Sequence, residues 1–262
     1  MIYTNTIMQE LTEDHVLKIM AGYEKEYKKN MRIPFWRFIP VLLLLRLAAF
    51  AQAPGQPSGG ANTGPRSAMQ IYEAGRYLEA QNRTSEAETY YNEAIRICQD
   101  EISRNVATRD TYAVITWAMR RQNKHADVLL LGEQCLRVYS DEYRVIETIG
   151  ESYFYLGDYG RSLNYMQRYV NSIPQGGRAS VAYFFIGEIY RFRGQFRHAD
   201  IAYTTAVRLE PGLALWWYRL GSVREAVGDF SPAIEAYERA IILNPNYREA
   251  NDGLARSRRQ IR

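Results

Sequence analysis

The feature that most constrains this chain of 262 residues is a pattern that recurs at a spacing of 34. Residues 180–213 and 214–247 carry the same order of glycine, alanine, aromatic and proline positions. Two consecutive copies at one fixed spacing predict a single structural unit that is used repeatedly. The shared positions are Tyr183, Ile186, Gly187, Gly194, Phe196, Ala199, Tyr203, Ala206 and Pro211, and then Trp217, Leu220, Gly221, Gly228, Phe230, Ala233, Tyr237, Ala240 and Pro245.

Each recurring residue type has a physical role in a pair of packed helices. Gly187 and Gly221 occupy the predicted crossing point of the two helices, where a larger side chain would hold the backbones apart. Gly194 and Gly228 occupy the predicted turn, where glycine adopts positive φ without penalty. Pro245 ends the second helix. Because a single pair cannot bury its own apolar face, such units are expected to stack.

This pattern resembles the tetratricopeptide repeat family, whose unit is a helix–turn–helix of about 34 residues. The resemblance implies an all-α fold, a right-handed superhelical solenoid of antiparallel helix pairs. We predict one domain over residues 68–262. Its repeats are 68–101, 109–142, 143–176, 180–213 and 214–247, followed by a capping helix at 248–262.

The predicted units depart from the pattern in three places. Residues 109–142 form the weakest copy, because Thr116 replaces the crossing glycine and Gly132 replaces the expected aromatic residue. The extra residues 102–108 predict a longer second helix in the first unit. The insertion 177–179 predicts a local change in the superhelical turn.

The N-terminal region differs in composition from the repeats. Residues 1–30 contain lysine and no arginine, whereas Lys124 is the only lysine after them, so we interpret them as a non-native upstream extension. The alternative is a translated amphipathic helix over residues 12–27. Residues 52–67 are rich in proline, glycine and small polar types, which predicts a linker.

Residues 31–51 have the three parts of a secretory signal peptide: a basic start, an apolar run over 38–51 and a small-x-small end. The run contains Arg46 and is shorter than the roughly 20 apolar residues of a spanning helix, which favours cleavage. The sequence therefore predicts an exported protein of the bacterial periplasm or outer envelope. The alternative is an inner-membrane protein anchored by residues 38–51.

Charge and chemistry exclude several function classes. After residue 51 the chain keeps 26 Lys/Arg against 24 Asp/Glu, too even a balance for nucleic-acid binding. Neither a catalytic nor a phosphate-binding motif is present, and the histidines are too far apart to predict a metal site. We therefore expect no enzyme activity and no cofactor. Cys98 and Cys135 are interpreted as small buried residues, with a disulfide as the alternative.

The resemblance also implies a binding surface. In the family the first helices line a concave groove that takes a peptide or helix of a partner protein, so we predict a non-catalytic protein–protein interaction scaffold. The alternative is a structural or assembly subunit that uses its convex face at Tyr90, Arg168 or Tyr169, or its arginine-rich end at 256–262. Contact with an envelope membrane is a further option for this end. The oligomeric state stays open. The predicted groove residues are Tyr72, Arg76, Trp117, Arg120, Arg121, Glu151, Phe154, Tyr155, Phe184, Glu188, Arg191, Phe192 and Tyr218.

Overall fold

The computed structural model describes residues 66–261, and this part of the chain is helical with no strand. The expectations for residues 1–30, 31–51 and 52–65 lie outside the described residues. Within the described part, no helix combines the length and the apolar character needed to cross a membrane. The helices are α2 (Ala68–Ala80), α3 (Thr84–Ser103), α4 (Arg109–Arg121), α5 (His125–Val138), α6 (Tyr143–Tyr155), α7 (Tyr159–Ser172), α8 (Ala179–Phe192), α9 (Phe196–Leu209), α10 (Ala214–Ala226), α11 (Phe230–Leu243) and α12 (Arg248–Gln260).

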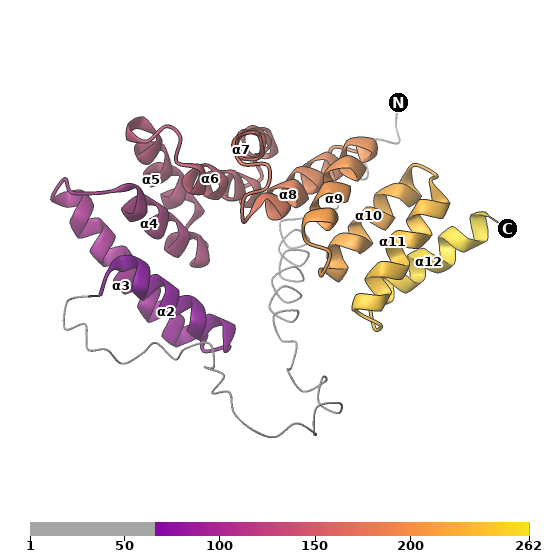
Figure 1. The fold of residues 1–262 in the computed structure, drawn as a ribbon, viewed down its shortest axis with the longest axis horizontal. Coiled ribbons are helices and arrows are strands. Elements are labelled where there is room, and N and C mark those ends of the chain that lie inside the picture. The colour runs from indigo at the N-terminus through magenta and orange to yellow at the C-terminus, as the bar shows by residue number, and fades with distance from the viewer. Residues whose placement is uncertain (1–65, 262) are drawn as a thin grey trace, which may run out of the picture.

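The helices form a tetratricopeptide-type solenoid, as predicted. Each helix packs against the next one along the chain, and the pairs follow one another from α2 and α3 to α12 (Figure 1). The first helices of neighbouring units also touch, since α2 contacts α4, α4 contacts α6 and α6 contacts α8. Side chains on the first helices therefore meet between units, and these helices make up the face that the family resemblance predicts to be concave.

The turns inside the units use positive backbone angles, as the pattern predicted. Gly194 and Gly228 have φ of 69° and 82°. In the first two units Asn82 and Asn123 take the same region, at 60° and 57°. Asparagine is the residue type other than glycine that tolerates this conformation best, so the turn geometry is kept where glycine is absent.

The helix crossing is as tight as the glycine pattern predicted. A Cβ atom added at Gly187 would lie 2.5 Å from the ring of Tyr203, and one added at Gly221 would lie 2.7 Å from Tyr237. Both tyrosine rings belong to the second helix of the same unit and are fully buried. The glycine thus makes room for the ring of its own unit.

The second unit differs at both of these positions. Thr116 stands at the crossing position, where it is fully buried and its hydroxyl donates to the carbonyl of Tyr112 at 2.7 Å. The position of the aromatic ring is taken by Gly132, where an added Cβ would lie 2.6 Å from Ile149 of the next unit. In this unit a larger residue stands at the crossing position, and the space at the ring position is filled by Ile149 of the next unit.

The departures from the repeat have structural counterparts. The helix α3 has 20 residues whereas the other second helices have 14, which confirms the predicted lengthening. Cys98 and Cys135 are fully buried and free, as interpreted, and burial raises the pKa of each thiol to about 12. The final helix α12 buries Ala250 and Gly253 and exposes its charged side.

Candidate interaction surface

The thirteen predicted groove residues all lie on the first helices, but five of them are buried. Their contact role in the prediction is therefore corrected, because a partner cannot reach side chains that are at most 5% exposed. The remaining eight keep accessible surface, and their binding role stays a prediction. The buried five are Tyr72, Glu151, Phe154, Phe184 and Glu188.

The buried aromatic residues are packed by rings from neighbouring helices. Phe184 stacks on Trp216 of the next first helix, with ring centroids 5.0 Å apart. Tyr72 lies between Tyr91 and Trp117, at 5.7 and 5.6 Å. These rings hold adjacent units together, so their burial follows from the stacking of units rather than from the position within one repeat.

The buried Glu188 is the centre of an ion-pair network between α8 and α10. Its carboxylate accepts a hydrogen bond from Arg191 at 2.8 Å and lies 3.1 Å from the Nε of Arg219. The hydroxyl of Tyr203, on the second helix of the same unit, also donates to it. Burial by itself would raise the pKa of Glu188, but Arg219 and Arg191 outweigh it and hold the pKa at about 2.

A second network joins α4, α6 and the insertion before α8. Glu151 lies 3.0 Å from Arg120, and Arg178 donates to both Glu151 and Glu147, the latter at 2.9 Å. Burial opposes ionisation of both carboxyls. For Glu151 the two arginines outweigh burial and lower the pKa, whereas for Glu147 burial dominates and raises it. The inserted Arg178 thus closes over the first helix of the preceding unit.

The outer units repeat the same arrangement. In the first, Glu79 accepts from the hydroxyl of Tyr91 at 2.8 Å and lies 3.4 Å from Arg121 of α4. In the fifth, the carboxylate of Glu225 pairs with Arg256 of α12 and accepts a hydrogen bond from the hydroxyl of Tyr237 in α11. We call the whole set the glutamate–arginine ladder: Glu79, Glu147, Glu151, Glu188 and Glu225 with Arg120, Arg121, Arg178, Arg191, Arg219 and Arg256.

The accessible part of the predicted groove consists of arginines and aromatic residues. Among these, Tyr155 stacks on His125 at 4.6 Å, and Phe192 stacks on Tyr159 at 5.2 Å with Arg191 over its ring. Such contacts restrain the side chains before any partner binds. Arg76 is exposed, and the half-buried residues are Trp117, Arg120, Arg121, Tyr155, Arg191, Phe192 and Tyr218.

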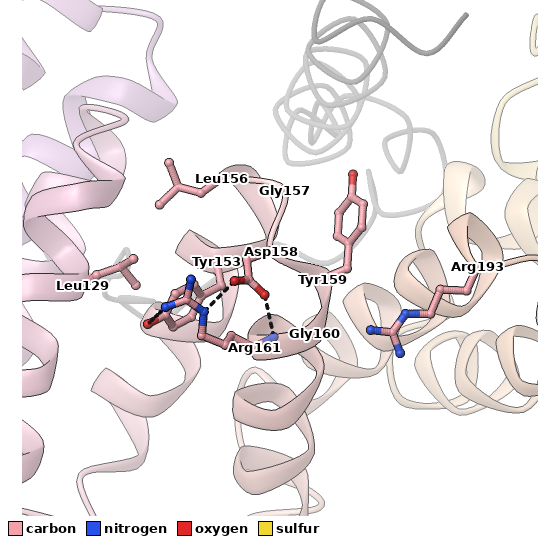
Figure 2. A pocket seen from close by; sticks show the side chains of 9 residues that line it. All are labelled: Leu129, Tyr153, Leu156, Gly157, Asp158, Tyr159, Gly160, Arg161 and Arg193. Carbon is pink, nitrogen blue, oxygen red and sulfur yellow. Dashed lines mark hydrogen bonds and ion pairs between the residues drawn. The ribbon is translucent and has the colours of Figure 1, made fainter. Parts of the chain in front are cut away.

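A separate hollow of about 630 Å³ lies at the edge formed by the turn between α6 and α7 (Figure 2). Leu129 and Leu156 stand on one side of it, and Tyr159 and Arg193 stand on the other. Between them Arg161 donates to Asp158 at 2.5 Å. The sequence reasoning did not predict this hollow.

The residues of the alternative binding surfaces are placed differently. Tyr169 is only 3% exposed, so it belongs to the core and its proposed role on the convex face is corrected. Tyr90 is half-buried, and the exposed Arg168 donates to the backbone carbonyl of Ser140. At the C-terminal end Arg256 pairs with Glu225 at 2.7 Å. This end is thus partly engaged within the array.

The described residues contain no group of three or more His, Cys, Asp or Glu that could hold a metal ion. His125 is enclosed beside Tyr155 and Arg120. Burial first and the charge of Arg120 second lower its pKa to about 4, so the imidazole is neutral near pH 7. A neutral stacked ring fits a packing role.

Comparison with protein families supports the repeat assignment. Models of the tetratricopeptide repeat match residues 71–101, 180–212 and 214–247. These matches and the eleven-helix array of residues 66–261 fit a tetratricopeptide repeat protein. No curated protein matches the chain.

Solved structures show the same fold at low identity. TTC0263, a thermophilic TPR protein of Thermus thermophilus, aligns with a TM-score of 0.53 at 16% identity over 74% of this chain and 99% of its own. MamA 41-end from Desulfovibrio magneticus RS-1 aligns with a TM-score of 0.51 at 16% identity, over 69% of this chain and 97% of its own. A crystal structure of MamA protein aligns with a TM-score of 0.53 at 20% identity, over 58% of this chain and 82% of its own. These similarities concern the fold alone.

Proposed function

We propose that this chain is a non-catalytic scaffold that binds an extended segment or helix of a partner protein on its concave face. The observation that carries the proposal is the composition of the accessible concave residues, which are four arginines and four aromatic residues. Arginine, tryptophan and tyrosine are the side chains that contribute most at protein interfaces. A solenoid of this kind provides an interaction surface rather than a reaction centre.

The ladder gives this surface its binding mechanism. The ladder glutamates at positions 147, 151 and 188 are at most 2% exposed, whereas Arg120 and Arg219 above them keep 15% and 12% of their side-chain surface. The guanidinium groups are held in place by these ion pairs, and the two side chains keep a small accessible surface. A partner with carboxylates and apolar side chains would bind to groups that are already ordered, so less entropy is lost on association.

Photo-crosslinking tests which face binds. We would place benzoylphenylalanine at Tyr155 or Phe192 on the concave face, and at Leu130 or Ile201 on the second helices, in the full chain within its native cells. Leu130 and Ile201 are matched controls because they are exposed and apolar. We expect one and the same partner to be crosslinked from both concave positions only. A partner crosslinked from the second helices alone would support the alternative, an assembly subunit that uses its convex face.

We propose further that the scaffold works in the bacterial cell envelope, on the basis of the signal-peptide pattern at 31–51. Intact mass and N-terminal sequencing of the native protein test this. We expect a mature start at Gln52 or Ala53 in the soluble envelope fraction. A chain that starts at Met1 and stays in the inner membrane would show that residues 38–51 act as an anchor, and a full-length cytoplasmic chain would contradict export.

A further inference from the structure

The hollow at the turn between α6 and α7 combines apolar walls with an exposed cation. Leu156 is 51% exposed although it is a large apolar residue. Leu129 stands beside it, Tyr159 stands on the opposite side of the hollow, and both are half-buried. Single exposed apolar residues are ordinary, but here they gather around one hollow, which is typical of a contact site.

The charges of the hollow are unequal. Its one lining carboxylate, that of Asp158, is held by Arg161 through the side chain at 2.5 Å and the backbone N–H at 2.9 Å. Arg193 on the opposite side is exposed and makes no side-chain ion pair or hydrogen bond with any residue from 66 to 261. The hollow therefore has an excess positive charge beside its apolar wall.

A glycine at the second position of α7, Gly160, leaves this space open. An added Cβ at Gly160 would have no neighbour closer than 3.5 Å, and the next nearest atom is Nη2 of Arg193 at 3.9 Å. The equivalent positions of the next two units are Arg197 and Ser231. A side chain of ordinary size at 160 would extend toward Arg193 and occupy the hollow.

We propose that this turn-edge hollow is a second docking site, which takes an apolar side chain flanked by carboxylates from an exposed segment of a partner protein. The apolar side chain fits between Leu156 and Tyr159, and a carboxylate pairs with Arg193. The exposed walls would enclose only part of a small molecule, whereas small-molecule sites usually bury most of their ligand. A protein segment gains further contacts along the edge. This site goes beyond the concave face and does not depend on its function.

A designed peptide can test the site without knowledge of the natural partner. The probe is acetyl-Gly-Ser-Asp-Leu-Asp-Ser-Gly-amide, titrated into the isotope-labelled full chain and followed through backbone amide resonances. We expect saturable shifts at residues 156–161 and 193 with a dissociation constant of about 1 mM or lower. A peptide with serine in place of both aspartates is expected to bind at least about fivefold more weakly, since it cannot pair with Arg193.

Two matched variants decide whether the hollow itself binds. Gly160→Leu fills the space and is expected to weaken the peptide at least about tenfold, the scale of one lost side-chain contact. Ser231→Leu makes a comparable change at the equivalent exposed position of the fifth unit and is expected to leave binding unchanged. Thermal midpoints close to that of the native chain would show that both variants fold.

Three results would overturn the proposal. The first is the absence of shifts at residues 156–161 and 193 at millimolar peptide, or shifts confined to the first helices. The second is native-like binding by a folded Gly160→Leu variant. The third is equal binding of N-acetylleucine and the peptide, which would make the hollow a site for small acids rather than for a protein segment.

Discussion

Replacing Gly187 by threonine is expected to lower the free energy of unfolding by about 3 kcal/mol, the upper part of the range for overpacking. The new Cβ would lie 2.5 Å from the ring of Tyr203. That ring cannot move away easily, because it is fully buried and its hydroxyl is bonded to Glu188. Urea denaturation followed by circular dichroism measures the loss.

Two controls separate the steric clash from other effects of the threonine. Gly212→Thr makes the same chemical change where an added Cβ has no neighbour within 4 Å, so only a small effect is expected. In a Tyr203→Ala background the ring is gone, and Gly187→Thr is then expected to cost less than about 1 kcal/mol. The same cost with and without the ring would contradict the packing of the crossing described here.

Replacing Glu188 by alanine is expected to destabilise the array by about 4 kcal/mol, as for other buried ion pairs that lose one partner. Arg191, Arg219 and the hydroxyl of Tyr203 would all lose their shared acceptor. Since Arg219 belongs to the next unit, the contact between α8 and α10 is expected to weaken most. Hydrogen exchange of these two helices reports that local loss.

The acid profile gives an independent readout for Glu188. Because its folded-state pKa is held at about 2, below the usual carboxyl value of 4.5, its contribution is present above pH 4.5 and is lost as the pH falls toward 2. In Glu188→Ala the free energy of unfolding is therefore expected to fall less steeply between pH 4.5 and pH 2 than in the native chain. Glu86→Ala, which breaks the exposed pair with Arg83, is expected to change stability little. An acid profile equal to that of the native chain would contradict the role of Glu188.

The sequence was sufficient to predict the fold because the recurring residues act within one unit. The crossing glycines and the positive-φ turn residues depend on local geometry, so their spacing is enough to place them. Thr116 and Gly132 were noted only as departures from the pattern. In the structure Thr116 is buried, and Gly132 gives its space to Ile149 of the next unit, a contact between units that the repeat spacing does not encode.

The candidate site was predicted less completely because its burial arises between units. The repeat register placed Glu151 and Glu188 on the first helices, but Arg120 and Arg219, which pair with them, come from other units, and Arg178 comes from the insertion. A sequence signal for this burial was missed: a glutamate on the first helix of a unit and a tyrosine on its second helix can form a hydrogen bond, as Glu188 and Tyr203 do. The hollow beside Gly160 depends on three-dimensional spacing and left no motif in the sequence.

Recognition on the concave face is tested most directly by the affinity of the partner segment found by crosslinking. Its dissociation constant would be measured for the native chain, for Phe192→Ala on the concave face and for Ile201→Ala, whose side chain is 68% exposed on the second helix α9. Thermal midpoints would confirm that both variants fold. We expect binding to weaken about tenfold or more for Phe192→Ala, because an aromatic contact is lost, and to stay unchanged for Ile201→Ala. Native-like affinity of Phe192→Ala together with loss of binding in Ile201→Ala would contradict the concave site.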